Sequence, residues 1–266
     1  MTAYRAKKRL GQSFLTSAAV ISKIVDLVDP KTDQKLVEIG PGRGALTLEL
    51  AQRVDRLLAV EFDRDLVGYL GKLVREYDSV EIVNADFLTL IPDEYNLTEF
   101  SLIGNIPYNI TTPVIDWCVK YRTRLNHVIL MIQKELADRI GGKPGSKNWA
   151  PLSIFTQLYF DVARRFEVPP SAFHPRPKVY SAVIELSPRR ETVAVDHARL
   201  ERLVRASFRH RRKLLLNNLV PEPIPDPAIS KEILGILGLP EKCRAEELTI
   251  EQFLELTNEL SARNIL

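Results

Sequence analysis

Short apolar runs and helix-period patterns alternate along the first 190 residues of the chain. The apolar runs have the length and β-branched content of buried strands, and they cover residues 35–39, 57–60, 80–83, 102–104, 127–132 and 180–186. Helical periodicity covers residues 20–28, 45–54 and 113–121. Strands that alternate with helices predict an α/β domain, residues 1–187, built on a mostly parallel Rossmann-like sheet.

The remainder, residues 188–266, is helical in pattern and predicts a small second domain. From Leu200 to Leu215 the apolar side chains fall on one side of a helical wheel. The opposite side carries five cations, which are Arg202, Arg205, Arg209, Arg212 and Lys213. Only Glu201 is nearby, so repulsion among these cations destabilises the helix unless a polyanion neutralises them. The alternative is a charged face that is merely solvated. We therefore expect one helix over 200–215 that binds RNA phosphates, then a proline-rich connection and two short helices.

Composition limits the class of protein. With 266 residues, 45% of them hydrophobic and 27% charged, the chain can bury the core of one large domain and one smaller one. No apolar run approaches the roughly 18 residues of a membrane span. The 2 cysteines form no C-x-x-C pattern and the 4 histidines are scattered, which argues against a disulfide framework or a metal site. We expect a soluble, cytoplasmic monomer without a metal or a membrane partner.

Two basic segments have open interpretations. Residues 1–25 contain no acid, a composition shared by transit peptides and by basic arms of mature proteins. The GQSFL turn at 11–15 leads directly into a helical pattern, so we expect mature sequence whose cations can meet phosphate. The glycine-rich loop at 141–148 predicts a flexible basic segment, which either closes over RNA or remains a solvated turn.

The strand at 35–39 leads into a glycine loop that is typical of nucleotide-binding turns. Gly40 and Gly42 let the backbone approach a ligand without an intervening Cβ, and the following helix adds N–H donors. Gly40, Gly42 and Ala45 also satisfy the dinucleotide fingerprint, with Glu61 at the spacing of a ribose-binding acid. The loop alone therefore does not separate NAD from another adenosine cofactor.

Acidic residues follow the next two strands. Glu61 suits a ribose diol and Asp86 suits an adenine amino group, because parallel strands deliver both to one edge of the sheet. The alternative is that each carboxylate merely caps the helix that follows it. A cofactor with adenosine and an amino acid but no pyrophosphate fits this pair, and that cofactor is S-adenosyl-L-methionine.

The run that begins at Leu102 stops at Asn105, Ile106, Pro107 and Tyr108. Pro107 lacks an N–H and disfavours helical geometry before it, so the Asn105 amide and the Ile106 carbonyl should lie free of the strand ladder. Two neighbouring acceptors can hold one exocyclic NH₂, and Tyr108 offers a stacking face with its hydroxyl left in water. An ordinary strand-ending turn is the alternative.

These motifs carry a resemblance to a known family. GQSFL (11–15), EIGPGRGALT (38–47), NADFL (84–88), NIPYNI (105–110), VPPSAFHPRPKVYSAV (168–183) and RHRRKLLLNNL (209–219) occur in the order seen in ribosomal RNA adenine N6-dimethyltransferases of the KsgA type. The resemblance runs nearly end to end. It implies a methyltransferase sheet whose last strand is antiparallel, and S-adenosyl-L-methionine as the cofactor. It also implies dimethylation of two adjacent adenosines near the 3′ end of the 16S rRNA, coupled to maturation of the small ribosomal subunit.

The resemblance also implies roles for residues that match the family motifs. Gln12, Ser13 and Leu15 would line the methionine end of the cofactor, and Gly40 and Gly42 would form the loop beneath it. Glu61 would bind the ribose, while Asp86 and Phe87 would hold the adenine. Asn105 would face the methyl group. Catalysis would rest on Asn105, Ile106 and Pro107, with Tyr108 and Phe173 enclosing the target base. Prolines on both sides of Phe173 stiffen its loop. One position departs from the family, since Ser13 stands where Asn or His is usual and has a shorter side chain.

Three other functions remain to be weighed. A methyltransferase of the antibiotic-resistance type would act on large-subunit rRNA, but the VPPSAF motif and the basic C-terminal pattern favour the small-subunit branch. An NAD-linked oxidoreductase leaves the NIPY motif unexplained. A non-catalytic RNA-binding or transcription factor on the same fold has no need of an intact NIPY motif together with both cofactor acids.

Overall fold

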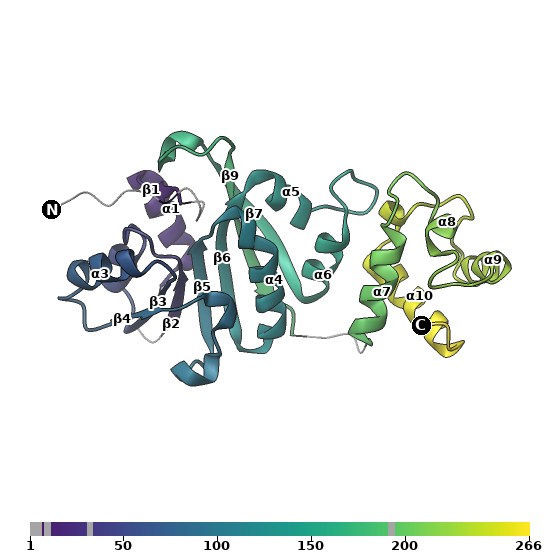
Figure 1. The fold of residues 1–266 in the computed structure, drawn as a ribbon, viewed down its shortest axis with the longest axis horizontal. Coiled ribbons are helices and arrows are strands. Elements are labelled where there is room, and N and C mark those ends of the chain that lie inside the picture. The colour runs from purple at the N-terminus through teal and green to yellow at the C-terminus, as the bar shows by residue number, and fades with distance from the viewer. Residues whose placement is uncertain (1–6, 8–11, 31–33, 191–194) are drawn as a thin grey trace. The chain divides into compact units, whose positions relative to one another are not determined.

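The computed structural model describes residues 7, 12–30, 34–190 and 195–266. The chain divides into two compact units, one made of Met1–Ala137 with Tyr159–Arg190 and the other of Asp138–Leu158 with Glu191–Leu266 (Figure 1). The segment Asp138–Leu158, which lies inside the expected first domain, thus belongs to the second unit. The assignment of methyl transfer to 1–187 and of RNA binding to 188–266 stays a prediction.

A seven-stranded sheet forms the centre of the described part of the first unit, in the order β4-β3-β2-β5-β6-β9-β7 (Figure 1). Its strands are β2 (Lys35–Ile39), β3 (Arg56–Glu61), β4 (Val80–Asn84), β5 (Phe100–Asn105), β6 (Leu125–Gln133), β7 (Phe160–Val168) and β9 (Ser181–Pro188). The pairs from β4 to β6 are parallel, whereas β9 runs antiparallel to β6 and to β7. The mostly parallel sheet with an antiparallel last strand is therefore confirmed. A separate antiparallel pair joins β1 (Phe14–Leu15) to β8 (Phe173–His174).

Strand β7 was not predicted, and its sequence explains why. Arg164 and Arg165 are adjacent in its centre, and the register shifts between Arg164 and Phe166, so the alternation of polar and apolar residues is broken. The strand lies at the edge of the sheet, where charged side chains can remain in solvent. The alternation of polar and apolar residues therefore does not predict β7, because its place at the sheet edge is known only from the sheet order.

The first unit also contains helices, and the first of them packs into the core beside the sheet. They are α1 (Ala18–Val28), α2 (Thr47–Ala51), α3 (Arg64–Leu73) and α4 (Thr111–Lys120), while α5 (Lys134–Ile140) and α6 (Pro151–Tyr159) each extend across the division between the units. Helix α1 ends where Asp29 adopts a left-handed conformation with φ of 43°, directly before Pro30. Its Ile24 and Val25 are buried in a core cluster with Ile103 and Ile129 of the sheet, which fixes one face of that sheet.

The second unit contains helices α7 (His197–Ser207), α8 (Leu215–Leu219), α9 (Pro227–Ile236) and α10 (Ile250–Ala262). Trp149 ties the segment before α6 to this unit, since it is fully buried and its Nε1 donates to the Leu248 carbonyl at 2.9 Å. The loop at 141–148, expected to be flexible, is held at its centre because the Gly145 amide donates to the Glu246 carbonyl at 2.6 Å. Nowhere in the part of the chain that the structure describes is a helix long and apolar enough to cross a membrane.

The prediction of one helix over 200–215 is wrong, because α7 ends at Ser207 and α8 begins at Leu215. Asn218, which is buried, donates from Nδ2 to the carbonyls of Ser207 and His210 at 2.8 and 3.0 Å. Its Oδ1 accepts from the His210 amide at 3.2 Å. This side chain therefore satisfies backbone groups that a continuous helix would have used, and residues 208–214 form a turn around it.

Candidate active site

A cavity of about 290 Å³ lies in the first unit, where β2, β3, β4 and β5 end. Every residue assigned from the sequence to the cofactor or the target base lines it, namely Gln12, Ser13, Leu15, Gly40, Gly42, Glu61, Asp86, Phe87, Asn105, Ile106, Pro107, Tyr108 and Phe173. These residues span most of the first unit in sequence, and the fold brings them together at the carboxyl edge of the sheet. This edge is where ligands bind in open α/β sheets.

The glycine loop supports one side of the cavity with a backbone that other residues rarely adopt. Gly40 and Gly42 have φ values of 61° and 62°, in the left-handed region. A Cβ on Gly42 would also lie 3.0 Å from the Phe14 ring, so a side chain there would require this ring to shift. The helix after the loop starts at Thr47, two residues later than the pattern predicted.

Glu61, at the end of β3, is a buried acid whose carboxylate is held by main-chain donors. Its Oε2 accepts from the Gly42 amide at 3.1 Å and its Oε1 from the Asp63 amide at 2.8 Å. Burial raises the pKa of Glu61, while these amides oppose the shift. Asp63, not Glu61, caps α3 by accepting from the Asp65 amide at 3.1 Å. Helix capping therefore does not explain Glu61.

Asp86 differs from Glu61 because it is exposed and does cap the turn that follows it. Its Oδ1 accepts from the Leu88 amide at 3.0 Å, which begins the 3₁₀ helix Phe87–Thr89. The capping alternative therefore holds for one carboxylate oxygen. The second oxygen has no hydrogen-bond partner among residues that the structure describes, so it remains available to a donor on a ligand.

The NIPY segment ends β5 with one fixed donor, and within the described ranges neither Asn105 Oδ1 nor the Ile106 carbonyl accepts a hydrogen bond. The Asn105 Nδ2 donates to the Ser13 carbonyl at 3.1 Å, which directs Oδ1 away from that bond. This bond uses the main chain of Ser13, so it is independent of the side chain that departs from the family pattern. The Ile106 amide donates to the Met131 carbonyl at 3.3 Å, which extends the ladder one residue beyond the strand.

The two aromatic residues assigned to the target base lie in different surroundings. The hydroxyl of Tyr108 is 2.9 Å from that of the buried Ser181, so the expectation that this hydroxyl is left in water is wrong. The bond fixes the ring relative to β9. Phe173 is 3% exposed and belongs to the core cluster as well as to the cavity wall. Its side chain is thus already supported by packing on β8.

The cavity residues that were not assigned from the sequence include Glu38, Arg43 and Phe62. Glu38 lies within β2, is 2% exposed, and accepts from the Thr47 hydroxyl at 2.7 Å. An acid inside an apolar strand run was the signal that could have identified it. The Arg43 guanidinium lies over the Phe14 ring, 4.9 Å from its centroid. Phe62, next to Glu61, is 62% exposed and lines the cavity with an apolar ring.

The N-terminal segment reaches the cavity at Gln12, while Lys7 binds acids at the start of α3. Lys7 Nζ lies 2.6 Å from Asp63 and 2.7 Å from Asp65, and these bonds raise the pKa of Lys7. The Gln12 Nε2 donates to Asp63 at 3.1 Å. The expectation that basic residues of this segment meet phosphate is therefore wrong for Lys7, while Arg5, Lys8 and Arg9 lie outside the described residues.

Glu38 provides a test of burial at the site. Burial raises the pKa of Glu38 to about 7. Between pH 4.5 and about pH 7 the unfolded chain releases this proton while the folded protein retains it, so folding stability falls as the pH rises. We expect Glu38→Gln to remove this loss, which is on the order of 3 kcal/mol relative to wild type. Urea unfolding across this pH range measures it.

The control is Glu49→Gln, because Glu49 is an exposed acid on α2. The control should follow the wild-type pH profile. If Glu38→Gln also follows the wild-type profile, burial does not raise the pKa of Glu38.

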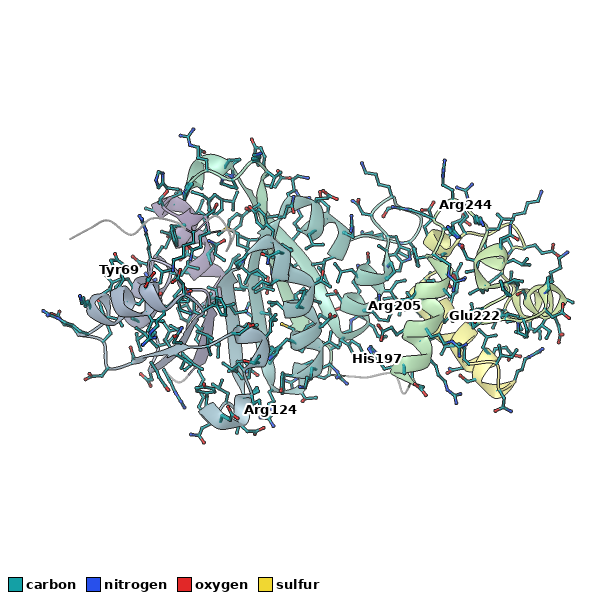
Figure 2. The ribbon with its side chains drawn as sticks, viewed as in Figure 1. Tyr69, Arg124, His197, Arg205, Glu222 and Arg244 are labelled. Atoms are coloured by element: carbon teal, nitrogen blue, oxygen red, sulfur yellow. The ribbon has the colours of Figure 1, made fainter. Side chains whose placement is uncertain are left out.

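The five cations assigned to RNA are all exposed in the second unit, but they do not share one helix. Arg202 and Arg205 lie on α7, whereas Arg209, Arg212 and Lys213 lie on the turn before α8. Arg205 (labelled in Figure 2) pairs with Glu201 at 2.6 Å. Ion-pair partners for Arg209, Arg212 and Lys213 are absent from the part of the chain described. The turn is therefore the stronger candidate for phosphate contact.

Arg211, which lies between Arg209 and Arg212 and was not assigned to RNA, has a structural role in the same turn. Its Nε donates to Glu246 at 2.8 Å, and its Nη2 donates to the Lys147 carbonyl. The guanidinium thus joins the turn to the loop at 141–148. Lys143 and Lys147 of that loop, which was expected to be basic, are exposed and add two cations to those of the turn.

Comparison with known proteins identifies the family. The model of the ribosomal RNA adenine dimethylase family matches residues 3–262. The ribosomal RNA small subunit methyltransferase A of Geobacter metallireducens is 40% identical over 265 residues, covering 97% of this chain and 96% of that protein. The protein of the same name from Xanthomonas euvesicatoria is also 40% identical, with 95% of each chain covered.

Solved structures agree. A dimethyladenosine transferase from Plasmodium falciparum has a TM-score of 0.83 at 25% identity, covering 94% of this chain and 98% of that one. The 23S rRNA methyltransferase ErmE has a TM-score of 0.72 at 28% identity, covering 93% and 99%. With five of its six motifs contributing residues to one cavity and a family match over nearly its whole length, the chain belongs to the ribosomal RNA adenine dimethylase family.

Proposed function

We propose that this protein uses S-adenosyl-L-methionine to dimethylate N6 of two adjacent adenosines near the 3′ end of 16S rRNA, during maturation of the small ribosomal subunit. The observation that carries the proposal is the convergence of the NIPY segment, the glycine loop and both cofactor acids on one cavity. Relatives named small subunit methyltransferase A are 36–40% identical over nearly the whole chain, which favours this substrate over the 23S rRNA of ErmE at 28%. An NAD-linked oxidoreductase would explain neither the NIPY segment at the cavity nor the similarity to these methyltransferases.

The cavity has the chemistry that S-adenosyl-L-methionine requires. The Glu61 carboxylate, which main-chain amides hold in the wall, would suit a cationic ligand. Glu61 would accept from the ribose hydroxyls, the free oxygen of Asp86 would accept from the adenine amino group, and Phe62 would cover the adenine ring. Gln12, Ser13 and Leu15 would lie beside the methionine part, with Gly40 and Gly42 beneath it. When bound, the cofactor supplies a methyl group on a positively charged sulfur.

Asn105 and Ile106 would position the nitrogen that accepts the methyl group. The N6 lone pair of adenine is delocalised into the ring, so it is a poor nucleophile until its hydrogens are drawn out of plane. Because Asn105 Nδ2 is held by Ser13, Oδ1 can accept one N6 hydrogen and the Ile106 carbonyl the other. Residues 105–108 contain no His, Asp or Glu, so the proton leaves to solvent after transfer. Pro107 fixes the turn, and Tyr108 and Phe173 would hold the unstacked base.

The second unit would bind RNA through its positive surface. Arg209, Arg212 and Lys213 on the turn would contact phosphates, with Arg202 and Arg205 on α7 beside them. Such contacts hold and orient the RNA without reading its sequence. In this division of labour, residues 1–187 carry the chemistry and residues 188–266 contribute affinity.

The role of Asp86 can be tested without loss of its cap. Asn at this position still accepts from the Leu88 amide, but it presents an NH₂ donor where the carboxylate presents an acceptor. We expect Asp86→Asn to weaken S-adenosyl-L-methionine binding by about 1 to 3 kcal/mol. Titration calorimetry measures the affinity, and an affinity equal to that of wild type would remove Asp86 from the adenine site.

Methyl transfer from labelled S-adenosyl-L-methionine tests the function as a whole. We expect incorporation into immature small ribosomal subunits and none into protein-free 23S rRNA. Labelling of 23S rRNA alone would support the antibiotic-resistance type of activity. Cofactor binding without labelling of either RNA would support a non-catalytic factor.

A further inference from the structure

The connection between β8 and β9, residues 175–180, presents an exposed aromatic beside the cavity. Tyr180 is 51% exposed and its neighbour Val179 is 37% exposed, so two consecutive apolar side chains face solvent. Arg176 and Lys178, both exposed, precede them. No acidic residue occurs between Glu167 and Glu185 in the sequence. The segment therefore combines an aromatic face with positive charge that no acid within the segment offsets.

Both ends of this connection are fixed to the cavity. Phe173, just before it, lines the cavity wall, and Ser181, just after it, binds the hydroxyl of the cavity residue Tyr108 at 2.9 Å. The Tyr180 carbonyl accepts from the Lys134 amide at 2.9 Å, and Ser181 pairs with Gln133 of β6. The backbone that carries Tyr180 is therefore held while its ring remains exposed. Such an aromatic can bind a ligand with little loss of conformational entropy.

From this arrangement we infer that Tyr180 is a stacking platform for a nucleotide that flanks the target adenosine, with Arg176 and Lys178 contacting the adjacent phosphates. The inference rests on the proposed function and names a further part of its substrate site. A target base in the cavity requires neighbouring nucleotides to cross the carboxyl edge of the sheet, where this connection lies. Unstacked single-stranded bases bind aromatic faces, and their phosphates bind arginine and lysine. The two cations favour RNA over a protein partner.

A single-stranded RNA oligonucleotide with two adjacent adenosines tests this inference when 2-aminopurine occupies the flanking position. Stacking on Tyr180 should quench its fluorescence. We expect Tyr180→Ala to weaken binding by about 5- to 100-fold and to remove the quenching, whereas Tyr180→Phe keeps the ring and binds within about twofold of wild type. Affinity for S-adenosyl-L-methionine should be equal in all variants, which shows that each variant is folded.

Tyr69 provides the matched control, because it is a tyrosine on α3 that is 44% exposed and does not line the cavity (Figure 2). Tyr69→Ala should bind the oligonucleotide like wild type. If wild type methylates RNA and Tyr180→Ala binds and quenches normally, the inference is overturned while the proposed function stands. It is equally overturned if Tyr180→Ala weakens binding only to assembled ribosomal particles, which would indicate a protein partner. If wild type neither binds nor methylates RNA, the proposed function fails first.

Discussion

Replacement of Asn105 by Ala should lower the turnover of methyl transfer by roughly 100-fold or more while cofactor affinity stays close to that of wild type. The reason is that Oδ1 would act on the N6 hydrogens as charge develops during transfer, and it would contribute less to ground-state binding. Turnover under saturating RNA and calorimetric cofactor affinity, measured on the same preparation, separate the two effects. Equal losses in both would make Asn105 a structural residue of the turn.

Asn105→Asp refines this test. Aspartate retains an oxygen that can accept from N6 but cannot donate to the Ser13 carbonyl as Asn105 does. If the acceptor is what matters, Asn105→Asp should retain more turnover than Asn105→Ala. If the bond to Ser13 is what matters, the two variants should lose turnover equally.

The second large effect is expected at the turn between α7 and α8. Replacing Arg209, Arg212 and Lys213 with Gln should reduce the slope of log RNA affinity against log salt by roughly 2 to 3 units, if each contacts one phosphate. Cofactor affinity should not change, because these residues do not line the cavity. The measurement is RNA affinity across a salt series for wild type and the triple variant.

Arg205 supplies the control for this experiment. It is exposed and cationic but already pairs with Glu201, so Arg205→Gln should leave the slope close to that of wild type, whereas loss of one phosphate contact would lower it by about 0.7 to 0.9 units. An unchanged slope in the triple variant would remove the turn from the RNA-binding surface. A larger change in Arg205→Gln than in the triple variant would place the contact on α7 instead.

Strands β2, β3 and β5, which end at the cavity, could be predicted because they are buried along nearly their whole length. β2 matches its predicted range of 35–39, and β5 ends at Asn105 where Pro107 required it to end. Runs of apolar residues give a clear signal when a strand lies inside a parallel sheet. The ordered motifs made the cavity residues predictable, since all thirteen residues assigned from these motifs line the cavity.

The features that escaped prediction depend on single side chains or on long-range contacts. The helical wheel over 200–215 could not show that the Asn218 side chain would donate hydrogen bonds to the carbonyls of Ser207 and His210. The bond between Tyr108 and Ser181 joins residues 73 positions apart, so the hydroxyl could only be assigned to solvent. Periodicity reports which face of an element is apolar, but it does not report such partners.

The most direct test of the central claim is to map the methyl groups, nucleotide by nucleotide, in 16S rRNA from immature small ribosomal subunits. The particles are incubated with the protein and S-adenosyl-L-methionine, and the RNA is then digested and sequenced by mass spectrometry. The proposed function predicts two adjacent N6,N6-dimethyladenosines near the 3′ end, which are absent when Asn105→Ala replaces the wild-type protein. Methyl groups at any other position, or 16S rRNA that remains unmodified while the protein binds its cofactor, would contradict it.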